Sequence, residues 1–141
     1  MIDHERAERR SCIPRPALRL VIVEDSRIIR ERLAGLLADI PNLATVAYAT
    51  TQDEALAILR KGEWEVVILD LQLKEGTGMQ VLDELAKTIR REETTIIVFS
   101  NFDFPAYRSR AIALGADFFF DKSSEFRRLH EVLTSLADSI H

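Results

Sequence analysis

Polar side chains of complementary chemistry follow four apolar runs of this chain. They are Glu24, Asp25, Asp70, Ser100 and Lys122. Near-continuous apolar runs are typical of parallel strands that are buried on both faces of a sheet. Because the carboxyl ends of such strands form one edge, where ligands bind, these side chains are expected to converge there. Together they could hold a divalent cation and handle a phosphoryl group.

The three carboxylates, Glu24, Asp25 and Asp70, would repel one another strongly within a few ångströms. A cation would relieve this repulsion, and Mg²⁺ is usually held by one or two carboxylates together with phosphate oxygens. The structural alternative is that acidic residues after strands cap the helices that follow. Three carboxylates at adjacent strand ends favour the metal site.

Lys122 and Ser100 complete the set, and each also has a structural alternative. The Lys122 ammonium can pair with Asp70 at rest and with a phosphoryl oxygen later, or it can form only a structural salt bridge. The Ser100 hydroxyl can donate to the same phosphoryl oxygen, or it can cap a helix.

Other chemistries lack their motifs. No glycine-rich phosphate loop follows the first strand, and no GxGxxG pattern is present. The histidines, His4, His130 and His141, lie near the chain ends, which disfavours a zinc site or a histidine-based triad. The remaining groups are those needed to form an acyl phosphate on Asp70.

Strand and helix patterns alternate from Leu18 onward. Strands are predicted at residues 18–23, 43–49, 64–70, 94–100 and 116–121. Helices are predicted after an N-cap at Ser26, after a capping box of Thr51 with Glu54, over an apolar stripe at 81–89, from Pro105 to Gly115, and after Ser123 or Ser124.

This alternation predicts an α/β fold with a five-stranded parallel sheet, strand order 2-1-3-4-5, and helices on both faces. The order places Glu24 and Asp25 on one side of the switch point between strands one and three, and Asp70 on the other.

Composition and charge narrow the class of protein. The 141 residues suffice for one domain, which we assign to residues 17–141 after a polar tail at 1–16. The net charge of −4 disfavours nucleic-acid binding through a broad basic face. The single cysteine, Cys12, excludes an internal disulfide and favours a reducing compartment. Without an apolar run of about 18 residues or a secretory signal, no membrane contact is expected, and the cytoplasm is the predicted location.

Five stretches, in this order along the chain, resemble the receiver domain of two-component response regulators. They are LVIVEDS, VVILDLQL, GTGMQVL, IIVFS and FFFDK, and the resemblance runs from about Leu18 to the C-terminus. It implies the flavodoxin-like receiver fold. It also implies a signalling protein that catalyses only its own phosphorylation and dephosphorylation.

The resemblance implies a role for each matching residue. Asp70 would accept a phosphoryl group from a histidine kinase, a phosphotransfer protein or a small acyl phosphate. Mg²⁺ would be held by Asp25, Asp70 and the backbone carbonyl of Gln72, with Glu24 acting directly or through water. Lys122 would bind a phosphoryl oxygen.

A switch is implied as well. Ser100 would be the switch hydroxyl, and Phe119 would be the switch aromatic that turns inward when Ser100 moves. By its pattern alone Phe119 could equally be a core residue on the opposite face from its neighbours. The surface of the fourth predicted helix, strand five and the last helix would then bind a downstream protein or a second copy. Lys74 stands where the family often has proline, which is expected to loosen the loop after Asp70.

Several hypotheses for the function remain at this point. The main one is a stand-alone receiver, because no output domain follows the last predicted helix. The alternatives are a receiver-like scaffold that takes no phosphate, a receiver fragment of a longer regulator, and an enzyme that uses an aspartyl nucleophile on external substrates. No segment is evident that could form the substrate pocket of such an enzyme.

Overall fold

The computed structural model describes residues 17–88, 93–101 and 104–139. The predicted tail at 1–16, with Cys12, and the end of the predicted stripe at residue 89 lie outside them. Strands and helices alternate along the described chain. The strands are β1 (Leu18–Val23), β2 (Leu43–Ala49), β3 (Val66–Leu69), β4 (Thr95–Ser100) and β5 (Phe118–Asp121). The helices are α2 (Arg27–Leu37), α3 (Gln52–Arg60), α4 (Gly78–Thr88), α5 (Pro105–Ala113) and α6 (Phe126–Asp138).

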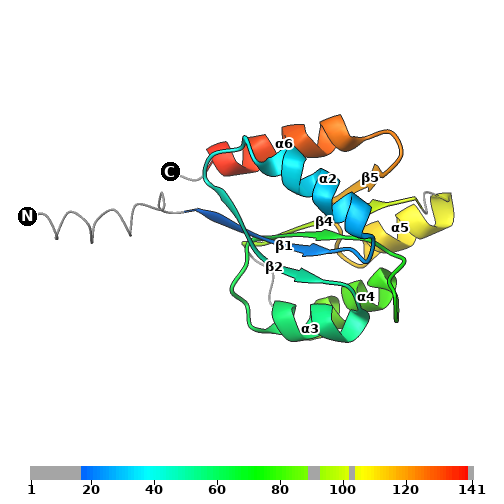
Figure 1. The fold of residues 1–141 in the computed structure, drawn as a ribbon. Helices are drawn as coiled ribbons and strands as arrows, with labels where there is room; N and C mark the ends of the chain where they lie inside the picture. Colours follow the sequence, from blue (N-terminus) through cyan, green and yellow to red (C-terminus); the bar gives the residue numbers. More distant parts are fainter. Residues whose placement is uncertain (1–16, 89–92, 102–103, 140–141) are drawn as a thin grey trace, which may run out of the picture.

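The strands form one parallel sheet in the order β2-β1-β3-β4-β5, which confirms the predicted fold class and strand order. Helices α2 and α6 cover one face, and α3, α4 and α5 cover the other (Figure 1). Because all strands run the same way, their carboxyl ends lie at one edge.

Each face of the sheet has its own apolar core. In β1, Val21 and Val23 pack on the side of α3 and α4, whereas Leu20 and Ile22 pack on the side of α2 and α6. Burial on both faces explains why the central strands are apolar at consecutive positions.

The predicted N-caps are confirmed at two helices. The Ser26 hydroxyl accepts from the Ile29 N–H at the start of α2, and the Thr51 hydroxyl accepts from the Glu54 N–H at the start of α3. Both contacts satisfy an N–H group that has no partner within its helix.

The predicted cap of the last helix is wrong. Neither Ser123 nor Ser124 caps α6, which begins after Glu125 and has no side-chain cap. Ser123 lies two residues before the N-cap position, and its N–H and its hydroxyl both donate to Oδ1 of Asp121 at 2.9 Å.

Strand β3 begins at Val66, two residues later than predicted, although the Glu65 N–H already donates to the Arg19 carbonyl at 2.9 Å and the Glu65 carbonyl accepts from the Thr95 N–H at 2.8 Å. Trp64 is buried and donates from Nε1 to the Leu59 carbonyl at 2.9 Å. Glu65 forms an ion pair with Arg19 of β1, with Nη2 of Arg19 2.6 Å from Oε2 of Glu65.

The Arg19–Glu65 pair makes stability depend on pH. Partial burial opposes ionisation of Glu65, but the hydrogen bonds and the charge of Arg19 outweigh it and hold the pKa of Glu65 below its ordinary value. A carboxylate with a lowered pKa contributes stability above its unfolded-state pKa, about 4.3, and loses that contribution as pH falls through the folded-state pKa.

We expect Glu65→Gln to lower the free energy of unfolding by about 0.5–1 kcal/mol at neutral pH, the scale of a solvent-screened pair. Glutamine keeps an oxygen for the Arg19 N–H, so the change isolates the charge. The difference should vanish in acid, below the folded-state pKa of Glu65. Denaturant titrations across this range measure it, with Glu31→Gln in the exposed Arg27–Glu31 pair as a control. A difference that persists unchanged in acid would contradict the assignment.

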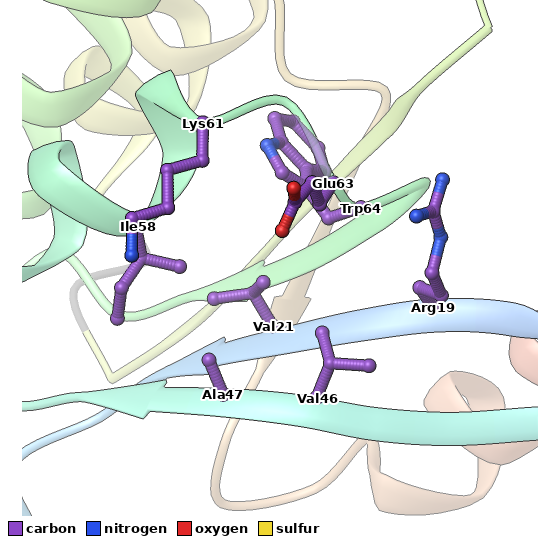
Figure 2. A pocket seen from close by; sticks show the side chains of 8 residues that line it. All are labelled: Arg19, Val21, Val46, Ala47, Ile58, Lys61, Glu63 and Trp64. Carbon is purple, nitrogen blue, oxygen red and sulfur yellow. The ribbon is translucent and has the colours of Figure 1, made fainter.

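A hollow of about 240 Å³ opens at the amino-terminal side of the strands (Figure 2). Its walls are Val21, Val46, Ala47, Ile58 and Trp64, with Arg19, Lys61 and Glu63 also lining it. It lies away from the carboxyl ends of β1 and β3, so it plays no part in the site below.

No helix within the described ranges is long and apolar enough to cross a membrane.

Candidate functional site

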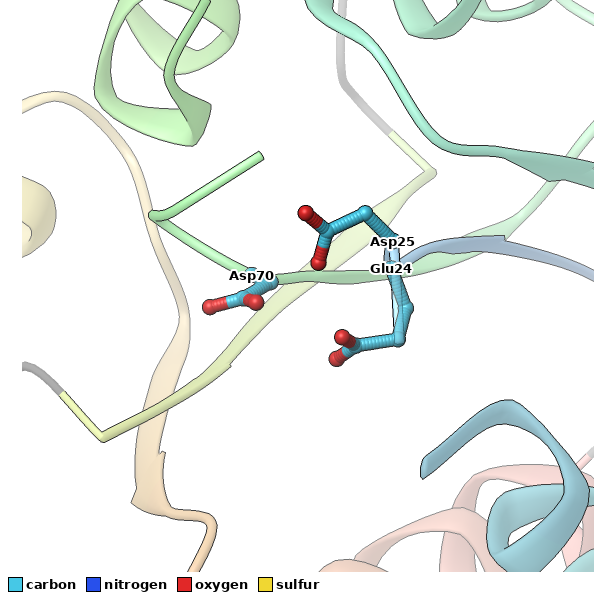
Figure 3. A group of neighbouring side chains, drawn as sticks. All are labelled: Glu24, Asp25 and Asp70. Atoms are coloured by element: carbon cyan, nitrogen blue, oxygen red, sulfur yellow. The ribbon is translucent and has the colours of Figure 1, made fainter. Parts of the chain in front are cut away.

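Three acidic side chains meet at the carboxyl-terminal edge of the sheet (Figure 3). Glu24 and Asp25 follow β1, and Asp70 follows the neighbouring strand β3. One carboxylate oxygen from each lies within 4.8 Å of the others. Glu24 is 2% and Asp70 is 4% exposed, whereas Asp25 is exposed to solvent. The structure thus brings the predicted carboxylate ligands together.

Lys122 follows β5, two strands away from Asp70, and its long side chain crosses the edge. Its Nζ lies 2.8 Å from Oδ2 of Asp70 and 2.9 Å from Oε1 of Glu24. The Lys122 side chain is only 10% exposed, so solvent ions screen these pairs weakly. The predicted pairing with Asp70 is present, and the pairing with Glu24 was not predicted.

The electrostatics of this ion triad, Glu24–Lys122–Asp70, are set by burial. Burial raises the pKa of Glu24, and the hydrogen bond from Lys122 offsets only part of this. Burial alone would lower the pKa of Lys122, but the hydrogen bonds and charges of Asp70 and Glu24 outweigh it and raise that pKa. Lys122 is therefore charged at neutral pH and compensates the buried carboxylates. The atoms that could bind a metal here are all carboxylate oxygens, and Mg²⁺ prefers oxygen ligands.

The start of α2 holds Glu24 in place. The Ser26 N–H donates to Oε2 of Glu24 at 3.0 Å, while the Ser26 hydroxyl caps the helix. Arg30 donates from Nη1 to the backbone carbonyl of Glu24 at 2.9 Å. Sequence patterns identified Ser26 only as a cap and gave no signal for Arg30, because its contact depends on how α2 leaves the sheet.

The loop between β3 and α4 folds back on Asp70. The Gln72 N–H donates to Oδ1 of Asp70 at 3.2 Å, and the Gly78 N–H donates to the Leu71 carbonyl at 2.9 Å. A Cβ atom on Gly78 would overlap the backbone carbonyl of Asp70. Only glycine therefore lets α4 begin this close to the site.

Lys74 was expected to loosen this loop, but its backbone does the opposite. The Lys74 N–H donates to the Thr50 carbonyl at 3.2 Å. Proline has no N–H and could not form this bond. The loop is therefore tied to the start of α3.

Ser100 ends β4 between β3 and β5 and is fully buried. Its carbonyl accepts from the Lys122 N–H at 3.1 Å, which places the two residues side by side. Ser100 does not cap the next helix, because α5 begins at Pro105 without a side-chain cap. The alternative of a simple helix cap is thereby removed.

Comparison with known proteins identifies the family. The family model of the response regulator receiver domain matches residues 20–134. This chain belongs to the response regulator receiver family. The receiver is therefore a signalling domain of the two-component type, and phosphorylation on aspartate and use of Mg²⁺ are general features of its family.

Curated relatives of the receiver are longer proteins. The chain is 30% identical over 123 residues to YvfU, a transcriptional regulatory protein of Bacillus subtilis. The matched segment covers 87% of this chain and 57% of YvfU. The chain is also 27% identical over 115 residues to protein-glutamate methylesterase/protein-glutamine glutaminase 1 of Methanospirillum hungatei. That matched segment covers 82% of this chain and 34% of the relative. The chain thus spans about a third to somewhat over half of these relatives.

Solved structures agree with the fold. The response regulator domain of Thermotoga maritima CheB gives a TM-score of 0.72 at 22% identity, covering 88% of this chain and 96% of that chain. The signal receiver domain of the DNA binding response regulator merR from Colwellia psychrerythraea gives 0.76 at 23% identity, covering 86% and 99%. At these identities the likeness shows the receiver fold alone.

Phe119 of the receiver lies on the opposite face of β5 from Phe118 and Phe120, as the alternation predicted. Phe119 is 4% exposed, and the Arg108 guanidinium of α5 lies 4.6 Å from the ring centroid. Arg108 also donates to the Phe119 carbonyl at 3.2 Å. The side chain is thus inward in this structure, and its role as a switch stays a prediction.

Proposed function

We propose that the receiver accepts one phosphoryl group on Asp70 from a phosphohistidine of a histidine kinase or phosphotransfer protein. The observation that carries this proposal is the ion triad, in which one ammonium bonds two buried carboxylates next to the third acid, Asp25. Phosphorylation adds further negative charge beside a group of three carboxylates and one ammonium, so the contacts of Lys122 must rearrange.

The chemistry is a transfer between two nucleophiles. A carboxylate oxygen of Asp70 attacks phosphorus, the P–N bond breaks, and its electron pair stays on the donor imidazole. Mg²⁺, held by Glu24, Asp25, Asp70 and the backbone carbonyl of Gln72, would neutralise charge on the phosphoryl oxygens. The Lys122 ammonium would give up its bond to the Asp70 carboxylate and would bind a phosphoryl oxygen instead.

The same event would change a surface. Ser100 would donate to the phosphoryl oxygen, and β5 with Phe119 and α5 would repack in response. On α5 and just before it, Phe104 is 63%, Tyr107 is 41% and Ile112 is 47% exposed. Among the residues of helix α5 only Ala111 is buried, so the helix packs against the rest of the domain through few apolar side chains. We propose that the α5–β5–α6 surface binds a downstream protein or a second copy after phosphorylation.

The proposal concerns residues 17–141 as one receiver domain and applies whether it acts alone or within a longer regulator. We propose that it works in the cytoplasm, contacts neither nucleic acid nor membrane, and catalyses no reaction besides its own phosphorylation and dephosphorylation.

The test is intact-mass measurement of the protein incubated with acetyl phosphate or a phosphorylated phosphotransfer domain, in Mg²⁺ or in EDTA. We expect a single phosphoryl adduct in Mg²⁺ and a large loss of that adduct in EDTA. No adduct with any donor would contradict the proposal and favour a scaffold that takes no phosphate.

A further inference from the structure

The loop at residues 71–77 decides where the backbone carbonyl of Gln72 lies. Within the loop, Gln72 and Thr77 form an antiparallel backbone bridge. Gln72 also donates its N–H to Oδ1 of Asp70. The position of Thr77 therefore bears directly on the position of Gln72 beside Asp70.

Gln52, the first residue of α3, forms two hydrogen bonds to the backbone of this loop. Its Oε1 accepts from the Thr77 N–H at 3.1 Å, and its own N–H donates to the Glu75 carbonyl at 2.9 Å. Gly76, with φ of 83°, lies against it so closely that a Cβ there would overlap the Gln52 side chain. In the described ranges, only Asp70 and Gln52 give the loop backbone a side-chain hydrogen bond from outside.

We propose that Gln52 is a positioning residue for the metal site, an inference that rests on the proposed function. Its Oε1 holds Thr77, Thr77 pairs with Gln72, and the Gln72 carbonyl is thereby set in place before Mg²⁺ arrives. Ordering this ligand in advance reduces the entropy that is lost on binding. Gln52 therefore raises the affinity for Mg²⁺ without touching it.

Gln52→Ala is expected to weaken Mg²⁺ binding about fivefold, the scale of one lost hydrogen bond. In EDTA, exchange of the Thr77 amide hydrogen should speed up by a similar factor. The unfolding midpoint in EDTA should stay close to wild type, because Gln52 is part-exposed and contacts a loop. At saturating Mg²⁺, phosphorylation should reach the wild-type level. Calorimetry, amide-exchange NMR and intact mass supply these readouts.

Two further variants separate reach from bulk. Gln52→Glu keeps an oxygen at the same distance from the backbone and should protect the Thr77 amide as wild type does. Gln52→Asn keeps the amide but is one methylene shorter, so it should behave like Gln52→Ala. Gln80→Ala is the matched control, because the Gln80 side chain donates to Glu84 at 3.3 Å, and alanine keeps the Gln80 N–H that donates to the Thr77 hydroxyl at 3.1 Å.

The outcomes are distinct. The positioning role is wrong if Gln52→Ala binds Mg²⁺ as tightly as wild type, or if its Thr77 amide exchanges at the wild-type rate. It is equally wrong if affinity falls only in step with global unfolding. If wild type itself binds no Mg²⁺ and takes no phosphoryl group, the proposed function fails and this inference fails with it.

Discussion

Lys122→Ala is expected to lower the free energy of unfolding in EDTA by about 3–5 kcal/mol, the cost of removing one partner from a buried ion pair. The change leaves Glu24, 2% exposed, and Asp70, 4% exposed, with no cation between them. Mg²⁺ should recover a large part of this loss and stabilise the variant more than wild type, since the ion would then take the place of the missing ammonium between the two buried carboxylates.

Denaturant titrations in EDTA and in Mg²⁺ measure this prediction. Lys87→Ala is the control, because Lys87 pairs with Asp83 at 3.1 Å on the surface, where solvent screens the pair, and its loss should hardly change the free energy of unfolding. Equal stability of Lys122→Ala and wild type in EDTA would show that the Lys122 charge does not offset the repulsion between the Glu24 and Asp70 carboxylates.

The same variant tests signalling. Phosphorylated Lys122→Ala should fail to change its association with a partner or a second copy, because the ammonium that reads the phosphoryl group is gone. Sizing or partner binding before and after phosphorylation measures this. Association that still follows phosphorylation normally would contradict the role of Lys122, whatever the stability shows.

Asp70→Asn is expected to abolish phosphoryl uptake while the protein stays folded. Asparagine keeps an oxygen that can accept from the Gln72 N–H, and Lys122 keeps Glu24 as its partner at 2.9 Å. One of three neighbouring like charges is also removed, so stability should change by only about 1 kcal/mol. Thermal unfolding and intact mass measure the two parts, with the exposed Asp138→Asn of α6 as the control. Unfolding of Asp70→Asn would make Asp70 a structural residue first.

The fold could be predicted from the sequence because its signals are local and agree with one another. Residues 18–23 are apolar at nearly every position, and Ser26 follows with a helical pattern, so the strand, its end and the next helix are each marked. The convergence of Glu24 and Asp70 then follows from parallel strands sharing an edge. The failed cap at Ser123 shows the limit, since α6 begins after Glu125 and Ser123 instead bonds locally to the Asp121 carboxylate.

The finer arrangement of the site could not be predicted, because it depends on contacts between segments distant in sequence. The bond from Lys122 to Glu24 requires a long side chain to cross two strands. The hydrogen bond between Gln52 and Thr77 joins residues that are 25 positions apart. Its donor is a backbone N–H, which no residue pattern indicates. Gly78 carried a usable signal, since a glycine at the first position of a helix suggests a close approach.

The most direct test of the central claim is to locate the phosphoryl group by peptide mass spectrometry. Wild-type protein is phosphorylated in Mg²⁺, the acyl phosphate is trapped chemically, and the digest is searched for the altered residue. We predict a single site at Asp70, with Glu24 and Asp25 unmodified. A phosphoryl group on any other residue, or on none, would contradict the account.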